Sequence, residues 1–228
     1  VGRILDSLDA AGIADNTIVI FTSDNGCAPV ADFPALARQG HHPSYIYRGH
    51  RADIYEGGHR IPFLIRWPGH IAPGRVCAET VCQVDLLATC AEIVGMTLPD
   101  TAGEDSVSSL DLWCGRPAGP PRREATVHHS FHGAFSIRQG RWKLELCPGS
   151  GGWSWPAPGQ EPAGAPPIQL YDLEADCGEQ TNLQDRHPDV VAHLTALLSR
   201  YVRDGRSTPG TPQPNTGPAH WPQLHWLS

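Results

Sequence analysis

The chain has 228 residues, of which 40% are hydrophobic, and a formal net charge of −7 from 17 Lys and Arg against 24 Asp and Glu. This length is enough for one large or two small globular domains. The acidic balance argues against a general nucleic-acid or anionic-membrane surface, and no apolar run approaches the roughly 20 residues that span a bilayer.

The first predicted elements are a helix and a strand. Apolar residues recur at helical spacing over residues 1–8, with no N-cap and no Met ahead of them, so we expect the chain to begin within a longer protein. Thr17–Phe21 is a β-branched and aromatic run, typical of a strand buried on both faces of a parallel sheet. Ile61–Arg66 is the other convincing strand before residue 115, so we expect the remaining strands of a doubly wound sheet upstream.

Polar residues follow the first strand directly. Such sheets place their chemistry at the carboxyl ends of their strands, and Asp24 and Asn25 there offer hard oxygen donors to calcium or magnesium. Gly26 then permits a sharp turn. The alternative is ordinary turn chemistry, because Asp and Asn also hydrogen-bond to their own backbone.

A basic loop over Tyr47–Pro62 comes next, and it suits an anionic ligand. Its planar guanidinium groups match the edge of a tetrahedral sulfate or phosphate. The alternative is that these side chains pair with Asp53 and Glu56 and only hold the backbone. The four arginines in the loop and just after it are Arg48, Arg51, Arg60 and Arg66.

A change in composition marks a predicted domain boundary. A helix over Asp85–Val94 is followed by a linker rich in Pro and Gly at 115–121. We therefore predict two domains, 1–115 and 116–228. The first is expected to be the C-terminal part of an α/β domain with a doubly wound mixed or parallel sheet.

The second domain is predicted to be a small antiparallel sheet with a helix. Turn residues separate its short strands, and a helix over 188–204 has an apolar stripe that should pack on them. Residues 208–228 are expected to form an extended tail that wraps the surface or is disordered. The predicted strands are 126–131, 135–138, 142–146 and 168–173.

Three further features leave alternatives open. The Gly- and Pro-rich insertion 147–167 holds Trp153 and Trp155, which could line an active-site rim for an aryl or sugar group or be tucked onto the neighbouring sheet; we favour the second. His128 and His129 cannot both bind one ion, because adjacent strand residues point to opposite faces. The seven Cys form no Cys-x-x-Cys pair, and one or two disulfides remain open.

The order of these motifs resembles the second half of a type I sulfatase, in the alkaline phosphatase superfamily. The resemblance covers nearly the whole chain and rests on five segments: GIADNTIVIFTSDNG, YRGHRADIYEGGHRIPFLIRWPG, QVDLLATCAEIVG, AFSIRQGRWKL and LYDLEADCGEQTNL. It implies that Asp24 and Asn25 complete a divalent-metal site, usually calcium. The family commonly has a Lys that touches the sulfate where this chain has Arg51, which keeps the charge but presents a wider planar fork.

The family's nucleophile motif is absent from these 228 residues. Sulfatases oxidise the Cys or Ser of Cys/Ser-x-Pro-x-Arg to formylglycine. The nearest match, Cys27-Ala28-Pro29-Val30-Ala31, has Ala31 in place of the Arg and follows the metal motif, so we treat it as coincidence. We expect the formylglycine upstream, and little or no turnover from this chain alone.

The resemblance therefore implies a hydrolase of sulfate esters whose substrate is a sulfated small molecule or glycan. Arg51 would be its catalytic and substrate-binding residue in this chain. One alternative is a phosphate or phosphonate ester hydrolase of the same superfamily, and another is a non-catalytic protein that binds sulfated glycans. Sulfatases with this pattern are often exported, which favours the periplasm or the exterior.

Overall fold

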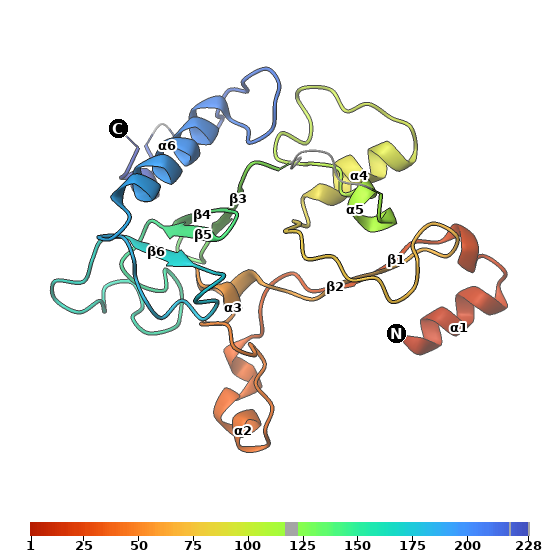
Figure 1. The fold of residues 1–228 in the computed structure, drawn as a ribbon, viewed down its shortest axis with the longest axis horizontal. Coiled ribbons are helices and arrows are strands. Elements are labelled where there is room, and N and C mark those ends of the chain that lie inside the picture. Colours follow the sequence, from red (N-terminus) through yellow and green to blue (C-terminus); the bar gives the residue numbers. More distant parts are fainter. Residues whose placement is uncertain (117–122, 219, 228) are drawn as a thin grey trace. The chain divides into compact units, whose positions relative to one another are not determined.

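The computed structural model describes residues 1–116, 123–218 and 220–227 (Figure 1). Tertiary contacts group them into two compact units. Unit 1 comprises Val1–Ser23, Pro62–Glu124 and Thr208–Thr211, and unit 2 comprises Asp24–Ile61, Ala125–Ser207 and Pro212–Ser228. Segment 24–61, assigned to the first domain from sequence, thus groups with the later residues. Most of the predicted linker falls on 117–122, outside the described residues, and the boundary at 115 stays a prediction.

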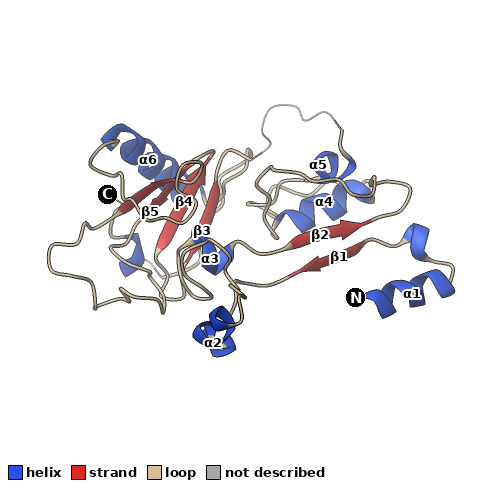
Figure 2. Ribbon diagram, turned by 60° about the horizontal axis from the view of Figure 1, so that its bottom comes forward, coloured by secondary structure: helices blue, strands red, loops and turns tan. Residues whose placement is uncertain are grey.

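Unit 1 contains a two-stranded antiparallel ribbon rather than the expected parallel strands. β1 (Val19–Thr22) pairs with β2 (Phe63–Arg66), so that Phe21 lies opposite Leu64 (Figure 2). These two side chains are 48% and 58% exposed, so β1 is not covered on both faces. A β-branched run determines that a strand forms, but the partner and its direction depend on residues far away in sequence.

The helices of unit 1 follow local signals. The expected first helix is confirmed, and the helix predicted over 85–94 is α4. The sequence analysis did not predict the short helix α5, in which Leu110 and Trp113 are buried. The helices are α1 (Gly2–Ala10), the 3-10 turn η1 (Ala14–Asn16), α4 (Asp85–Ile93) and α5 (Leu110–Cys114).

Unit 2 is built on the predicted antiparallel sheet. Its four strands pair in the order β3-β4-β5-β6, and α6 (Pro188–Asp204) packs on one face (Figure 1). Leu194 and Leu198 of α6 meet Ile137 and Leu144 of the sheet in the main hydrophobic core. The strands are β3 (Thr126–His129), β4 (Phe135–Gln139), β5 (Trp142–Glu145) and β6 (Gln169–Asp172).

The other elements of unit 2 are short. The tail packs against the core through Trp226, which is the first of the two arrangements expected for it. The short elements of unit 2 are η2 (Pro29–Ala31), α2 (Phe33–Arg38), the one-turn helix α3 (Glu56–His59) and η3 (Pro222–Leu224).

All seven cysteines are free thiols. No helix in the described part of the chain is long and apolar enough to cross a membrane.

Candidate functional site

The Asp24–Asn25 pair lies on the loop that follows β1. Asp24 is exposed, and hydrogen bonds from the Asn25 side chain and from backbone N–H groups hold the pKa of its carboxyl below the usual range. The Arg51 guanidinium lowers this pKa further through its charge. Asp24 is therefore ionised near neutral pH and near enough to Arg51 to feel its charge.

Close backbone contact joins this loop to the basic loop. The Gly26 N–H donates to the Gly58 carbonyl at 2.9 Å, and the Arg51 N–H donates to the Cys27 carbonyl at 3.0 Å. A Cβ atom on Gly26 would lie 1.8 Å from the Gly57 carbonyl oxygen, so only glycine permits this approach. The two motifs, separated by more than twenty residues in sequence, are therefore joined through their backbones.

Three of the four arginines bind other residues of the chain and stabilise the fold. Arg48 donates to the Glu179 carbonyl at 2.9 Å and lies over the Tyr55 ring. Arg60 pairs with Glu56 at 3.1 Å, as the alternative interpretation predicted for the basic loop. In unit 1, Arg66 pairs with Asp9 at 3.4 Å.

Arg51 differs from these three arginines. It is exposed, and among the residues that the structure describes no carboxylate lies within ion-pair distance of its guanidinium. Its Cζ lies 5.9 Å from the centre of the Trp153 ring. Of the four arginines, Arg51 is the best placed to bind an external anion.

A buried carboxylate holds the backbone beside Arg51. Asp53 is 3% exposed and accepts hydrogen bonds from the N–H groups of His50 at 2.9 Å, Trp153 at 2.8 Å and Ser154 at 2.9 Å. The Ser154 hydroxyl also donates to it. Asp53 is thus satisfied by backbone donors rather than by an arginine, contrary to the pairing considered from sequence, and it ties insertion 147–167 to the basic loop.

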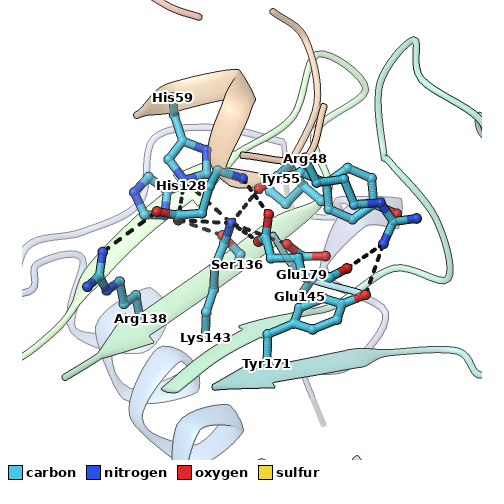
Figure 3. A network of polar contacts seen from close by, with 12 residues as sticks. Arg48, Tyr55, His59, His128, Ser136, Arg138, Lys143, Glu145, Tyr171 and Glu179 are labelled. Atoms are coloured by element: carbon cyan, nitrogen blue, oxygen red, sulfur yellow. Dashed lines mark hydrogen bonds and ion pairs between the residues drawn. The ribbon is translucent and has the colours of Figure 1, made fainter. Parts of the chain in front are cut away.

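A second buried network anchors α3 to the sheet (Figure 3). Lys143 on β5 is fully buried, and its Nζ lies 2.6 Å from Glu179, 3.2 Å from Glu56 and 3.2 Å from Glu145. The same ammonium donates to the Ile54 carbonyl at 2.9 Å, and the other Glu179 oxygen accepts from the Glu56 N–H at 2.7 Å. One lysine therefore holds together α3, β5 and the turn that contains Glu179.

The carboxyl groups of this network differ in charge. Burial raises the pKa of Glu56, but the Lys143 ammonium and a hydrogen bond from His59 outweigh it and hold that pKa well below its usual range. Burial and the Glu179 carboxylate raise the pKa of Glu145 well above its usual range, against the opposing charge of Lys143. The pKa of Glu56 is thus lowered and that of Glu145 raised, which reduces the negative charge that the network buries.

Two histidines close the network. The rings of His59 and His128 are stacked with centroids 3.8 Å apart, and His59 Nε2 lies 3.1 Å from a Glu56 oxygen. Burial lowers the pKa of both rings, and the charge of Lys143 lowers it further. His129 instead meets Phe135, which confirms that the adjacent histidines point to opposite faces.

The donor chemistry at Asp24 and Asn25 fits part of a calcium or magnesium site. An ionised carboxylate and a carboxamide are the oxygen ligands that these hard cations prefer. No group of three or more His, Cys, Asp or Glu that could hold a metal occurs in the described ranges. The pair can therefore contribute to such a site but does not form a complete cage with other side chains described here.

The Lys143 network was not predicted from the sequence. Its signal lay in Trp142–Leu146, where the charged Lys143 and Glu145 alternate with apolar residues. Leu144 faces α6 and the core, so Lys143 and Glu145 must point to the other face. Neither face of β5 is open to water, so its charged side chains are buried. The same alternation of charged and apolar residues is usually read as a strand with one face in solvent.

Comparisons with known proteins relate the chain to one family. A sequence model named Sulfatase matches residues 1–96. An N-acetylgalactosamine-6-O-sulfatase of Bacteroides thetaiotaomicron is 36% identical over 87% of this chain and 39% of its own length. Human arylsulfatase A is 34% identical over 80% of this chain and 36% of its own length.

A solved structure agrees with these sequence matches. A sulfatase from work on glycosaminoglycan metabolism by Bacteroides thetaiotaomicron has a TM-score of 0.75 and 34% identity, and the match covers 87% of this chain and 41% of that one. The chain thus spans about two fifths of the length of that structure and of the curated relatives it matches.

Proposed function

The chain belongs to the sulfatase family, of whose members it matches the carboxyl-terminal part, and we propose that the intact protein hydrolyses a sulfate ester. The observation that carries this proposal is the direct contact between two loops, one with Asp24 and Asn25 and the other with Arg51. Both loops lie in unit 2, and direct backbone hydrogen bonds link them.

We assign one role to each of these side chains. Asp24 and Asn25 would hold a divalent cation, calcium or magnesium, which when bound supplies positive charge to the sulfuryl oxygens. Arg51 binds and orients the sulfate through its planar set of N–H donors. The formylglycine nucleophile would come from a segment outside these 228 residues, which contain no Cys/Ser-x-Pro-x-Arg motif.

The substrate is proposed to be a sulfated small molecule or glycan. The relatives reported above are named as sulfatases, which places sulfate ahead of phosphate. Arg51 suits phosphoryl oxygens equally well, so a phosphate or phosphonate ester is the second candidate. Because the bacterial relative is named for N-acetylgalactosamine, a 6-sulfated amino sugar is the first compound to test on a full-length protein.

Titration of the chain with inorganic sulfate tests the role of Arg51. We expect Arg51→Met to abolish measurable sulfate binding by calorimetry, while Arg66→Met, which removes an arginine paired with Asp9, leaves it unchanged. Equal binding by both variants would overturn the assignment. A second assay follows nitrophenyl sulfate with the chain alone, and turnover at the rate of a whole enzyme would contradict the upstream position of the nucleophile.

A further inference from the structure

Two large aromatic side chains lie exposed beside Arg51. Trp153 is 45% exposed and Phe131 is 66% exposed, and their ring centroids are 5.2 Å apart with planes 55° apart. Trp155, two residues further along, is 69% exposed. Single exposed aromatics need no explanation, but a paired set at one place is a feature of ligand surfaces.

The backbone of both aromatics is attached to the residues that directly follow Arg51. The Trp153 N–H donates to Asp53 Oδ1 at 2.8 Å, and the Phe131 N–H donates to the Ala52 carbonyl at 2.8 Å. A Cβ atom on Gly152 would lie 2.3 Å from that same carbonyl, so the insertion is in close contact with the basic loop. The backbone that carries the two rings is therefore joined to the backbone next to Arg51.

This position agrees with the geometry of a sulfate ester. One ester oxygen separates the sulfur from the first carbon of the organic group. The ring of a sulfate ester held by Arg51, attached directly or through the exocyclic C6 carbon of a 6-sulfated sugar, then lies within a few bonds of the guanidinium. The Trp153 ring is there, with its centre 5.9 Å from Arg51 Cζ. The charge of Arg51 and the neighbouring apolar faces are complementary to a molecule with an anionic end and a partly apolar ring.

We propose that Trp153 and Phe131 form a binding platform for the sugar ring of a sulfated saccharide, a reading that rests on the sulfatase function proposed above. A hexose has an apolar C–H face that can stack on an aromatic ring and hydroxyl edges that stay hydrated. An exposed aromatic surface suits such a ring, whereas a wholly apolar aryl group gains most in a closed pocket. This replaces the interpretation favoured from sequence, in which the tryptophans are tucked onto the sheet.

Calorimetric titration of the full 228-residue chain with galactose 6-sulfate, galactose and inorganic sulfate tests the platform. We expect Trp153→Ala to weaken galactose 6-sulfate binding by about tenfold, since it removes one stacked apolar face, and to leave inorganic sulfate binding unchanged. Trp153→Phe should restore part of the affinity. Trp221→Ala is the matched control, because Trp221 is also in unit 2 and 41% exposed but lies in the tail.

The outcomes separate the platform from the proposed function. If Arg51→Met weakens galactose 6-sulfate while Trp153→Ala does not, the platform is refuted and the sulfate site stands. If Arg51→Met changes the affinity for neither galactose 6-sulfate nor inorganic sulfate, the proposed function fails. If Trp153→Ala weakens the binding of nitrophenyl sulfate but not that of galactose 6-sulfate, the sugar assignment is overturned in favour of an aryl group. If the unmodified chain does not bind galactose 6-sulfate, the aromatic platform is overturned as well.

Discussion

Replacing Lys143 by Met tests the buried network most directly. Met has a similar length and stays apolar, so it fills the space of the stem but removes the ammonium from a fully buried position. The variant leaves the Glu179 and Glu56 carboxylates without their nearest cation, at 2.6 Å and 3.2 Å, and removes the donor to the Ile54 carbonyl. Breaking a buried ion pair from one side costs about 3–5 kcal/mol.

Two features of the structure place the expected loss at the lower end of that range. Glu56 keeps Arg60 at 3.1 Å and Arg138 at 3.8 Å, so its charge is not left wholly unpaired. Burial raises the pKa of Glu145, which weakens its ion pair with Lys143 at 3.2 Å, so less is lost there. We therefore expect the free energy of unfolding to fall by about 3 kcal/mol, a large part of the 5–15 kcal/mol typical of folded proteins.

Urea unfolding followed by circular dichroism measures this loss. Arg141→Met is the matched control, because the Arg141 side chain is 44% exposed where it pairs with Asp172, and its loss should cost about 1 kcal/mol. A Lys143→Met variant as stable as the Arg141→Met variant would refute the claim that the buried ammonium holds α3 to the sheet.

Two further predictions concern close packing and pH. A methyl group at Gly26 would approach a carbonyl oxygen of α3 to 1.8 Å, so Gly26→Ala should separate the two loops and weaken inorganic sulfate binding in the same titration. The control Gly2→Ala, with nothing within 4 Å, should leave that binding unchanged. The free energy of unfolding should be highest near pH 6.5. Below it the unfolded chain protonates His59 and His128 while the lowered pKa values keep them neutral in the fold, so stability falls with falling pH. The unfolded Glu145 carboxyl loses its proton near about pH 4.3, and its raised pKa in the fold delays that loss, so this group lowers stability with rising pH from there upwards. The two histidines outweigh it below about pH 6.5, and above that pH it acts without them. Urea unfolding between pH 5 and pH 8 measures both limbs, and Glu145→Gln should remove the decline above about pH 6.5 and steepen the fall in stability below it. A decline that persists in this variant would assign it to another group.

Much of the secondary structure was predictable from local patterns. The helix predicted over 188–204 is observed with those bounds, because an apolar stripe defines its face and Gly205 adopts the left-handed conformation that ends it. The strands of the antiparallel sheet were predicted to within about two residues for the same reason: turn residues separate short runs that alternate or are apolar. Such signals act between residues close together in sequence.

The site was predicted only in part. Asp24, Asn25 and Arg51 were singled out from residue type and motif order, and their roles in metal and sulfate binding stay predictions. The structure adds that Gly26 and Gly57 bring their two loops into contact. The patterns did not indicate this contact, because a glycine's need for close approach depends on what packs against it.

The sequence by itself determined where most helices and strands form and indicated the family of the chain, and it singled out Asp24, Asn25 and Arg51 as candidates for binding a cation and an oxyanion. Only the tertiary structure decided that β1 pairs antiparallel with β2, that Lys143 faces buried carboxylates rather than water, and that Trp153 stands beside Arg51. The physical reason is the same in each case. Local propensity acts over a few residues, whereas a strand's partner, a buried charge's counter-ion and a ring's neighbour are set by chain segments that approach only when the whole unit packs.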